Sequence, residues 1–161
     1  MAWTREDLQT KFIAFYEEHQ LPVQFDRKDG KYYLYMNMKE EENRLKISID
    51  VKGSAFIVDA VMPIRVPSMQ MMQKIYYLIN KINMYSEFGC ISVSDVGQVT
   101  LHYPVDMTDR EATEDVLADM LAFPSYTSEK IVKTLEPVIE YDADPDKVFN
   151  KVYGDVLQGQ A

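Results

Sequence analysis

Apolar residues in the N-terminal segment recur at the spacing of a helix. Leu8, Phe12 and Phe15 fall three or four residues apart, which predicts one buried face of a helix over residues 4–20. Thr4 supplies a hydroxyl for the amino-terminal cap, and acidic residues follow it in the first turn, where they complement the helix dipole. The segment is therefore predicted to be an amphipathic helix.

The period of the pattern changes to two residues after Gly30. Apolar and polar side chains alternate over residues 31–38 and, most strictly, over residues 44–52, and a third apolar run covers residues 55–64. Alternation of this kind is typical of a half-buried strand. The connections between the runs are too short for parallel crossovers, so we predict three strands of an antiparallel meander.

A second amphipathic helix and a hairpin are predicted next. Pro67 and Ser68 introduce a helical pattern over residues 68–86, the longest in the chain. Alternating apolar residues over 91–103, interrupted by a turn at Gly97, then indicate two further strands, so that five strands are predicted in all.

The C-terminal third is predicted to be helical. The capping box Thr108–Glu111 indicates the start of one helix, Pro124 an interruption, and the apolar residues over 131–139 a further helix. An acidic stretch follows, and Asp144 with Pro145 is typical of the start of a short tail helix.

The predicted element order is α-β-β-β-α-β-β-α-α plus a short C-terminal tail helix. This order indicates an α+β fold, in which helices pack on an antiparallel five-stranded sheet. We expect residues 1–140 to form a single α+β domain, and residues 141–161 to form an acidic linker and the C-terminal tail helix.

Net charge and cysteine content limit the classes of partner and compartment. The chain has 17 Lys and Arg against 26 Asp and Glu, a formal net charge of −9, and contains no basic run. Nucleic acids and anionic membrane surfaces attract clustered basic side chains, so we expect neither as a partner. Cys90 is the single cysteine, which excludes an intrachain disulfide and a structural zinc cluster. With no signal-peptide pattern and no apolar run of the ~20 residues that span a bilayer, we expect a cytoplasmic protein.

The sequence contains no recognisable catalytic or cofactor-binding constellation. Nucleophilic catalysis needs a Ser, Cys or Thr beside a base, and the two histidines, His19 and His102, are predicted to lie at a helix end and on a sheet surface. Cys90, at the entry to a strand, is interpreted as a small apolar residue, because no basic residue is near it in sequence. We therefore predict no catalytic residue, no cofactor and no enzyme activity.

The acidic stretch Asp142–Asp146 has the opening of a calcium loop, D-x-D-x-D. Lys147 occupies the position where that loop requires glycine, and Tyr153 occupies the position of its bidentate glutamate. We therefore interpret the stretch as a solvated linker with a helix cap, and we predict no metal site.

Three segments in the middle of the chain form a recognisable series. Ile79–Asn83 ends a helix with paired asparagines, and Glu87–Val93 with Gly97–Leu101 forms a hairpin around a glycine turn. An aromatic residue, Phe123, lies in the next helix. This series resembles the YbjN-like family, although Ile82 replaces a tryptophan that is frequent there. The resemblance implies the fold of type III secretion chaperones, a bacterial origin, and a non-enzymatic, regulatory or chaperone-like role.

The methionine content bears on function. Ten methionines favour a protein-binding module that acts through an apolar Met-rich surface, because flexible thioether side chains adapt to varied partners. An alternative is a small-molecule-sensing domain with a tyrosine-lined pocket between the sheet and the helices. A third alternative is an enzyme with an unfamiliar site.

The predicted helix over residues 68–86 has a wider apolar arc than one sheet requires. Met71, Leu78 and Tyr85, each seven residues apart, add a second stripe to the one suited to covering the sheet. We predict that this stripe contacts another helix of the same chain, such as the first or the tail helix, a second copy in a homodimer, or a foreign protein partner. These three residues are the candidate partner-binding or dimer-interface site.

Overall fold

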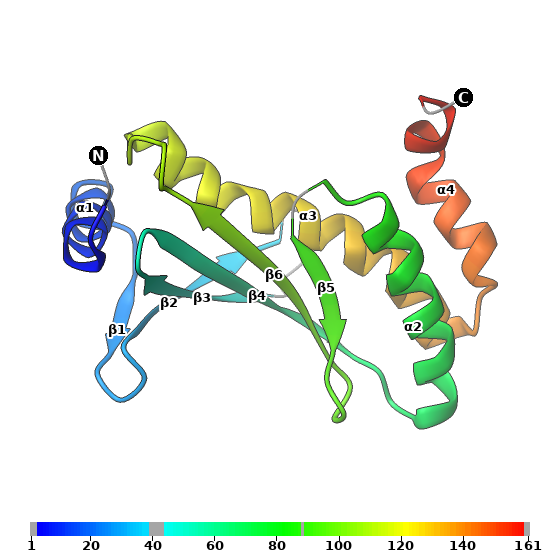
Figure 1. The fold of residues 1–161 in the computed structure, drawn as a ribbon. Coiled ribbons are helices and arrows are strands. Elements are labelled where there is room, and N and C mark those ends of the chain that lie inside the picture. The colour runs from blue at the N-terminus through cyan, green and yellow to red at the C-terminus, as the bar shows by residue number, and fades with distance from the viewer. Residues whose placement is uncertain (1–2, 39–43, 88, 160–161) are drawn as a thin grey trace.

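The computed structural model describes residues 3–38, 44–87 and 89–159. In chain order its elements are α1 (Arg5–Glu18), β1 (Gln24–Asp26), β2 (Lys31–Asn37), β3 (Arg44–Lys52), β4 (Ala55–Arg65), α2 (Met69–Met84), β5 (Cys90–Val93), β6 (Gln98–Asp106), α3 (Glu114–Tyr141) and α4 (Pro145–Gln158). Helix α3 runs across one face of a twisted sheet, with α1 at one end of the molecule and α2 and α4 at the other (Figure 1).

The strands form one antiparallel sheet of six in the order β1-β2-β3-β4-β6-β5. The predicted α+β class and the antiparallel meander are confirmed, but the sheet has six strands rather than the predicted five. The additional strand is β1, three exposed residues that pair with the start of β2. So short and exposed a strand has no alternation of buried and exposed residues by which a pattern could reveal it.

One face of the sheet forms the core beneath α1 and α3. Strand β3 shows the strict alternation predicted for it, and its buried residues are Leu45, Ile47, Ile49 and Val51. Helix α1 adds Phe12, whose ring centroid lies 5.3 Å from that of Tyr32 and 5.9 Å from that of Phe56. Removing a side chain of this size from water contributes about 1.5–3 kcal/mol. The opposite face of the sheet carries half-buried and exposed side chains.

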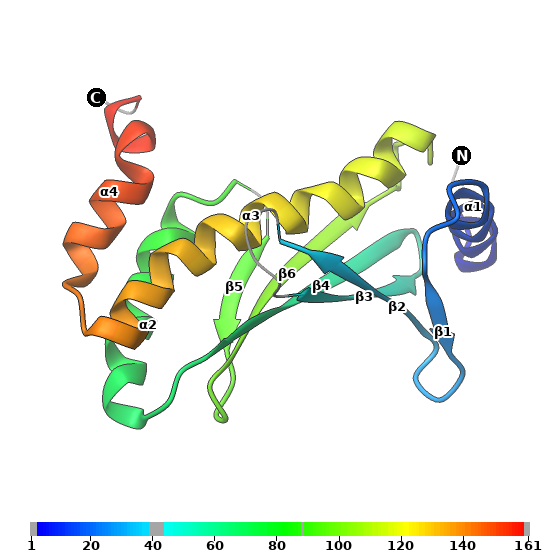
Figure 2. The same ribbon diagram turned by 180° about the vertical axis from the view of Figure 1, so that it is seen from behind.

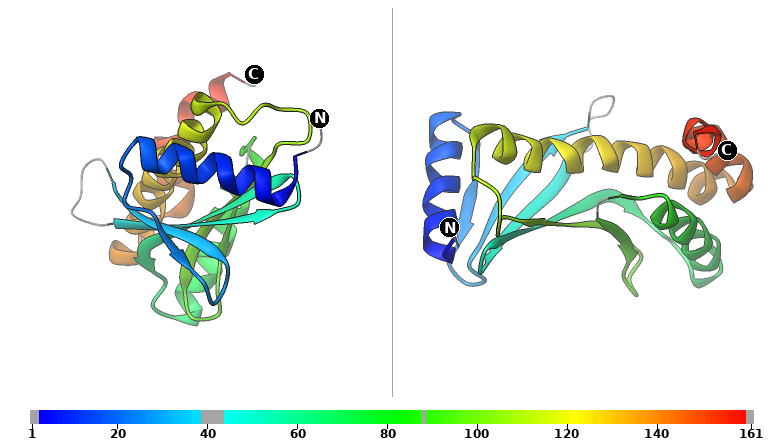
Figure 3. Two further views of the ribbon diagram at one scale, coloured as in Figure 1. Left: turned by 90° about the vertical axis from the view of Figure 1, so that its left-hand side faces the viewer. Right: turned by 45° about the horizontal axis from the view of Figure 1, so that its top comes forward.

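Helix α3 corrects two predictions about the C-terminal third. It begins at Glu114 after the cap residue Thr113, and the Thr108 hydroxyl, predicted to cap a helix, instead donates to the Asp106 carboxylate at 2.6 Å. It also continues through Pro124 without the predicted interruption, so the two predicted helices are one. A proline inside a helix costs about 3 kcal/mol. Helix α3 lies across the sheet (Figure 3). It buries one stripe of its side chains, and packing of this extent outweighs the local preference.

Helix α4 confirms the predicted tail helix. The Asp144 side chain accepts a hydrogen bond from the Lys147 N–H at 3.0 Å, and Pro145 occupies the first helical position. Its buried residues, Phe149 and Tyr153, contact α2 and α3, beside which α4 lies at one end of the molecule (Figure 2). Among the helices of the described residues, none has the length and hydropathy needed to span a bilayer.

Candidate protein-binding surface

The inner side of α2 packs within the chain. Of the predicted interface residues, Leu78 is fully buried, Met71 is half-buried against the core, and the Tyr85 ring centroid lies 5.8 Å from that of Phe149 in α4. The structure therefore brings the predicted stripe against its own chain, which is the first of the three alternatives. A contact of these residues with a second chain stays a prediction.

The solvent side of α2 is also apolar. Its large apolar side chains Met69, Tyr76, Tyr77 and Met84 are 75%, 48%, 49% and 72% exposed. With about 3.6 residues per turn, these four span an arc of about 100°, and two amide side chains lie between them. We call this surface the α2 solvent face, and its residues are Met69, Gln73, Tyr76, Tyr77, Asn80 and Met84.

No charged residue of α2 lies within the α2 solvent face, and charged groups contact it only at its Tyr77 edge. Within Met69–Met84, which the structure describes in full, the charged residues are Lys74 and Lys81, and both pair with carboxylates that flank the start of α4. The chain as a whole has a net charge of −9, so an uncharged apolar helix face contrasts with the rest of its composition. The cores of protein–protein interfaces are depleted of Lys, Glu and Asp and enriched in Tyr and Met, which is the composition found here.

Polar contacts on both flanks hold α2 in place. On one flank, Lys81 bonds the Asp146 carboxylate at 2.6 Å, and the Tyr77 hydroxyl donates to the same carboxylate at 2.8 Å. The bond from Lys81 also holds the pKa of Asp146 below its usual range. On the other flank, the Asn83 amide bonds the N–H and the carbonyl of Ile91 in β5, at 2.8 and 3.0 Å. A partner would therefore meet a preorganised surface.

A tyrosine-lined groove lies where α2, α3 and α4 meet. Tyr85, Tyr126 and Tyr153 line it together with Phe123 and Lys130, and its volume is about 430 Å³. The Lys130 Nζ lies 4.4 Å from the centroid of the Tyr153 ring, and burial raises the pKa of Tyr153 to about 12. The tyrosine-lined pocket of the sequence analysis was expected between the sheet and the helices, whereas this groove lies between helices.

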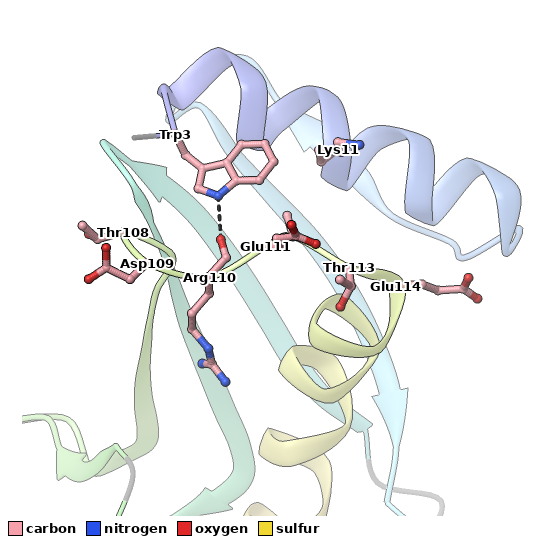
Figure 4. A pocket seen from close by; sticks show the side chains of 9 residues that line it. Trp3, Lys11, Thr108, Asp109, Arg110, Glu111, Thr113 and Glu114 are labelled. Atoms are coloured by element: carbon pink, nitrogen blue, oxygen red, sulfur yellow. Dashed lines mark hydrogen bonds between the residues drawn. The ribbon is translucent and has the colours of Figure 1, made fainter. Parts of the chain in front are cut away.

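A wider opening lies between α1 and the loop that joins β6 to α3 (Figure 4). Its volume is about 730 Å³, and beside it the Trp3 indole N–H donates to the Arg110 carbonyl at 2.7 Å. Figure 4 shows that the charged side chains around it, among them Lys11, Glu111 and Glu114, point in different directions. Catalytic groups need to converge on one reacting atom, so this opening is not a catalytic candidate.

The histidines and the cysteine have the following surroundings. His19 ends α1 and lies 2.9 Å from Glu114, and His102 lies on the sheet surface, both as predicted. Cys90, which the sequence analysis interpreted as a small apolar residue, is exposed at the start of β5. Cys90 lies directly opposite His102 in the β5–β6 pair, and His102 in turn contacts Asp59 at 2.6 Å. This proximity depends on strand register, which periodicity alone leaves open.

Comparison with known proteins identifies the fold. No family model and no curated protein sequence matches the chain. Among solved structures, YbjN from E. coli, a proposed transcription regulator, has a TM-score of 0.61 at 10% identity, covering 85% of this chain and 92% of YbjN. ExsC in the ExsC–ExsE complex has a TM-score of 0.52 at 13% identity, covering 80% and 92%. The type III secretion chaperone SycH from Yersinia pestis, in complex with a fragment of YscM2, has a TM-score of 0.43 at 12% identity, covering 73% and 96%.

These similarities bear on the fold alone. The identities are too low to transfer the role of any residue, and the SycH match is too distant to carry an argument. The chain has the fold of YbjN and of ExsC, as the resemblance noted in the sequence implied.

Proposed function

We propose that this protein is a non-enzymatic protein-binding module, with a regulatory or chaperone-like role, that contacts its partner through the α2 solvent face. The observation that carries the proposal is an uncharged, exposed and apolar helix face on a chain of net charge −9. The fold adds support, because ExsC, to which the chain is similar, forms a complex with ExsE.

The geometry of α2 limits the form of the partner. A helix of 16 residues is about 24 Å long, so its face fits a helix or an apolar strip of similar length. The flexible side chains Met69 and Met84 lie at the two ends of the face, and the more rigid Tyr76 lies near its middle. Central aromatic side chains are the usual anchors of protein interfaces. We therefore infer a partner that offers an apolar helical surface, either a second copy of this chain or a foreign protein.

Affinity capture from an extract of the native cell tests the proposal. The variant Tyr76→Glu/Met84→Glu adds two charges to the α2 solvent face, and the control Ala14→Glu/Ala118→Glu adds two charges at exposed positions of α1 and α3. A protein that binds through the face is expected with the wild type and the control and is expected to be lost with the variant. Light scattering shows whether that protein is a second copy. If the variant retains every partner and the wild-type mass, the α2 solvent face is not the binding surface.

The tyrosine-lined groove favours a second candidate function, the sensing of a small molecule. Ligand pockets are largely apolar, with a few polar groups that orient the ligand, and Lys130 supplies a cation beside Tyr126 and Tyr153. In a thermal-shift screen of aromatic carboxylates, binding is expected to raise the Tm of the wild type but not of Thr127→Trp, in which the indole fills the groove. If no compound raises the Tm of the wild type, this function is contradicted for that ligand class.

A further inference from the structure

Three chemically different side chains form one row across the open face of the sheet. Asp59 of β4 lies directly opposite His102 of β6, and His102 lies directly opposite Cys90 of β5. The next residues along two of these strands, Leu101 and Ile91, are buried on the other face, so the row faces solvent. Figure 1 shows the three strands side by side, with β6 between β4 and β5.

The Asp59 carboxylate determines which nitrogen of the His102 imidazole carries the proton. His102 Nδ1 lies 2.6 Å from Asp59 Oδ1, and the two side chains are 44% and 30% exposed. An ionised carboxylate only accepts hydrogen bonds, so the proton of this contact belongs to Nδ1. In the neutral ring Nε2 then carries a lone pair, and it is the nitrogen available to accept a proton.

The backbone holds Cys90 close to this pair. Directly opposed residues of antiparallel strands have Cβ atoms about 4.5–5.5 Å apart, so the exposed Cys90 and His102 are immediate neighbours on this face. Gly89 has a φ of +72°, and a Cβ atom there would lie 2.6 Å from the His102 carbonyl oxygen. Any larger residue at this position would therefore push the start of β5, and Cys90 with it, away from His102.

We propose that Cys90 is a site of reversible modification by low-molecular-weight disulfides, with His102 as the base for its thiol and Asp59 as the residue that positions His102. Nε2 accepts the thiol proton, Sγ attacks one sulfur of the disulfide, a new S–S bond forms to Cys90, and the original S–S bond breaks. The departing thiolate takes a proton from the imidazolium or from water, so one thiol and one disulfide enter and one of each results. A base beside a nucleophile, itself oriented by a third group, is the arrangement that activates thiols and hydroxyls. A second thiol reverses the modification by the same exchange.

The single cysteine makes the test specific. The released thiopyridone of a neutral dipyridyl disulfide reports Cys90 alone, because the chain has one cysteine. At about pH 7 the native wild type is expected to react about fivefold to tenfold faster than the same chain unfolded in urea. His102→Gln is expected to lose that advantage. The control Thr100→Val, which changes another residue on the same face of β6, is expected to keep it.

A pH profile separates a positioning role of Asp59 from a structural one. The rate for the wild type is expected to persist below about pH 8, where an ordinary thiol loses about tenfold per pH unit. Asp59→Asn is expected to follow the ordinary profile, and Asp59→Glu is expected to restore that of the wild type. By strand register, the other charged side chains on this face of the described strands, unchanged in every variant, are Asp26, Lys31, Arg44, Lys46, Asp50, Lys52, Arg65 and Asp106.

Three outcomes would overturn the proposal. Native Cys90 that reacts no faster than the unfolded chain would contradict it without any variant. If His102→Gln leaves the rate unchanged, and circular dichroism shows that the variant is folded, His102 is not the base for the Cys90 thiol. If Asp59→Asn has the same pH profile as the wild type, Asp59 does not position His102.

Discussion

The two sides of α2 have similar residues in different surroundings. Ile75 and Leu78 on the inner side are buried, whereas Tyr76 and Met84 on the solvent side are 48% and 72% exposed. An apolar helix face is normally buried against a neighbouring element. Because Tyr76 and Met84 are this exposed, no described element covers the solvent side of α2. Hydrophobicity along a helix therefore does not separate core from contact surface, because the neighbouring elements decide which part of the arc is covered.

Truncation on the inner side is expected to have the largest effect on stability. Leu78→Ala removes a fully buried side chain and leaves a cavity, which is expected to lower the free energy of unfolding by about 2–5 kcal/mol. The matched change on the solvent side, Met84→Ala, is expected to alter it by less than about 0.5 kcal/mol. Urea unfolding measures both. A folded Leu78→Glu chain with unchanged Tm and half the wild-type mass would instead place Leu78 between two copies.

Asn83 and Asn80 of α2 allow a packed position and a solvent-exposed position to be compared with the same residue type. Asn83→Ala removes two hydrogen bonds to the backbone of Ile91, and the expected loss is about 1–3 kcal/mol of the free energy of unfolding. Asn80→Ala removes an exposed amide and is expected to change that free energy by less than about 0.5 kcal/mol. Hydrogen exchange at the Ile91 amide is expected to accelerate only in Asn83→Ala. Equal stability and equal exchange in the two variants would show that Asn83 does not hold β5.

The stability contributed by the contacts between α2 and α4 is expected to depend on pH. The bonds from Lys81 and Tyr77 hold the pKa of Asp146 below its usual range. A carboxyl with a lowered folded pKa adds stability above its unfolded pKa, near about 4, and loses that contribution as the pH falls through the folded pKa. The Tm difference between wild type and Asp146→Asn is therefore expected at neutral pH and is expected to vanish below about pH 3.

The size of this pH effect is limited by solvent. Both Asp146 and Lys81 are accessible, so added salt is expected to reduce the Tm difference. Asp155→Asn, at an exposed position of α4, is the control, because it removes one negative charge from the same helix without removing this ion pair. A difference between wild type and Asp146→Asn that is the same at every pH would rule out the ion pair as its cause.

Charges on the solvent side are expected to have little effect on stability. Tyr76→Glu/Met84→Glu changes only exposed residues, so the free energy of unfolding is expected to change by less than about 1 kcal/mol even though partner binding is lost. Thermal unfolding measures this directly. A Tm far below that of the wild type would mean that the solvent side supports the fold, and the distinction between the two sides of α2 would be wrong.

Local patterns were sufficient to predict most of the elements. The alternation in β3 and the caps Thr4 and Asp144 each depend on neighbouring residues, and all three features are present. The start of α3 was missed because a local contact competes for the predicted cap, and its continuation through Pro124 was missed because it depends on tertiary packing. A free Thr108 hydroxyl is a good cap, but Asp106 takes it, and the helix continues through Pro124 because its buried stripe lies on the sheet.

The candidate surface was predictable only in part. The wide apolar arc of α2 follows from its sequence, but the covered side depends on where α3 and α4 pack. Leu78 is fully buried and Tyr85 packs on Phe149 of α4, whereas Tyr76 is exposed. The row containing Cys90 and His102 needed the register of β5 on β6, which no pattern of apolar residues specifies.

The hydrogen bond between Trp3 and Arg110 gives the molecule an optical signal confined to one end. Trp3 is the only tryptophan in the chain, and its indole is tied to the loop before α3. Its fluorescence therefore reports the end of the molecule that lies far from α2 and α4 (Figure 1), whereas circular dichroism reports the whole backbone. If α1 leaves the sheet before the core melts, the fluorescence transition will come first, and coincident transitions will mean that both ends unfold as one cooperative unit.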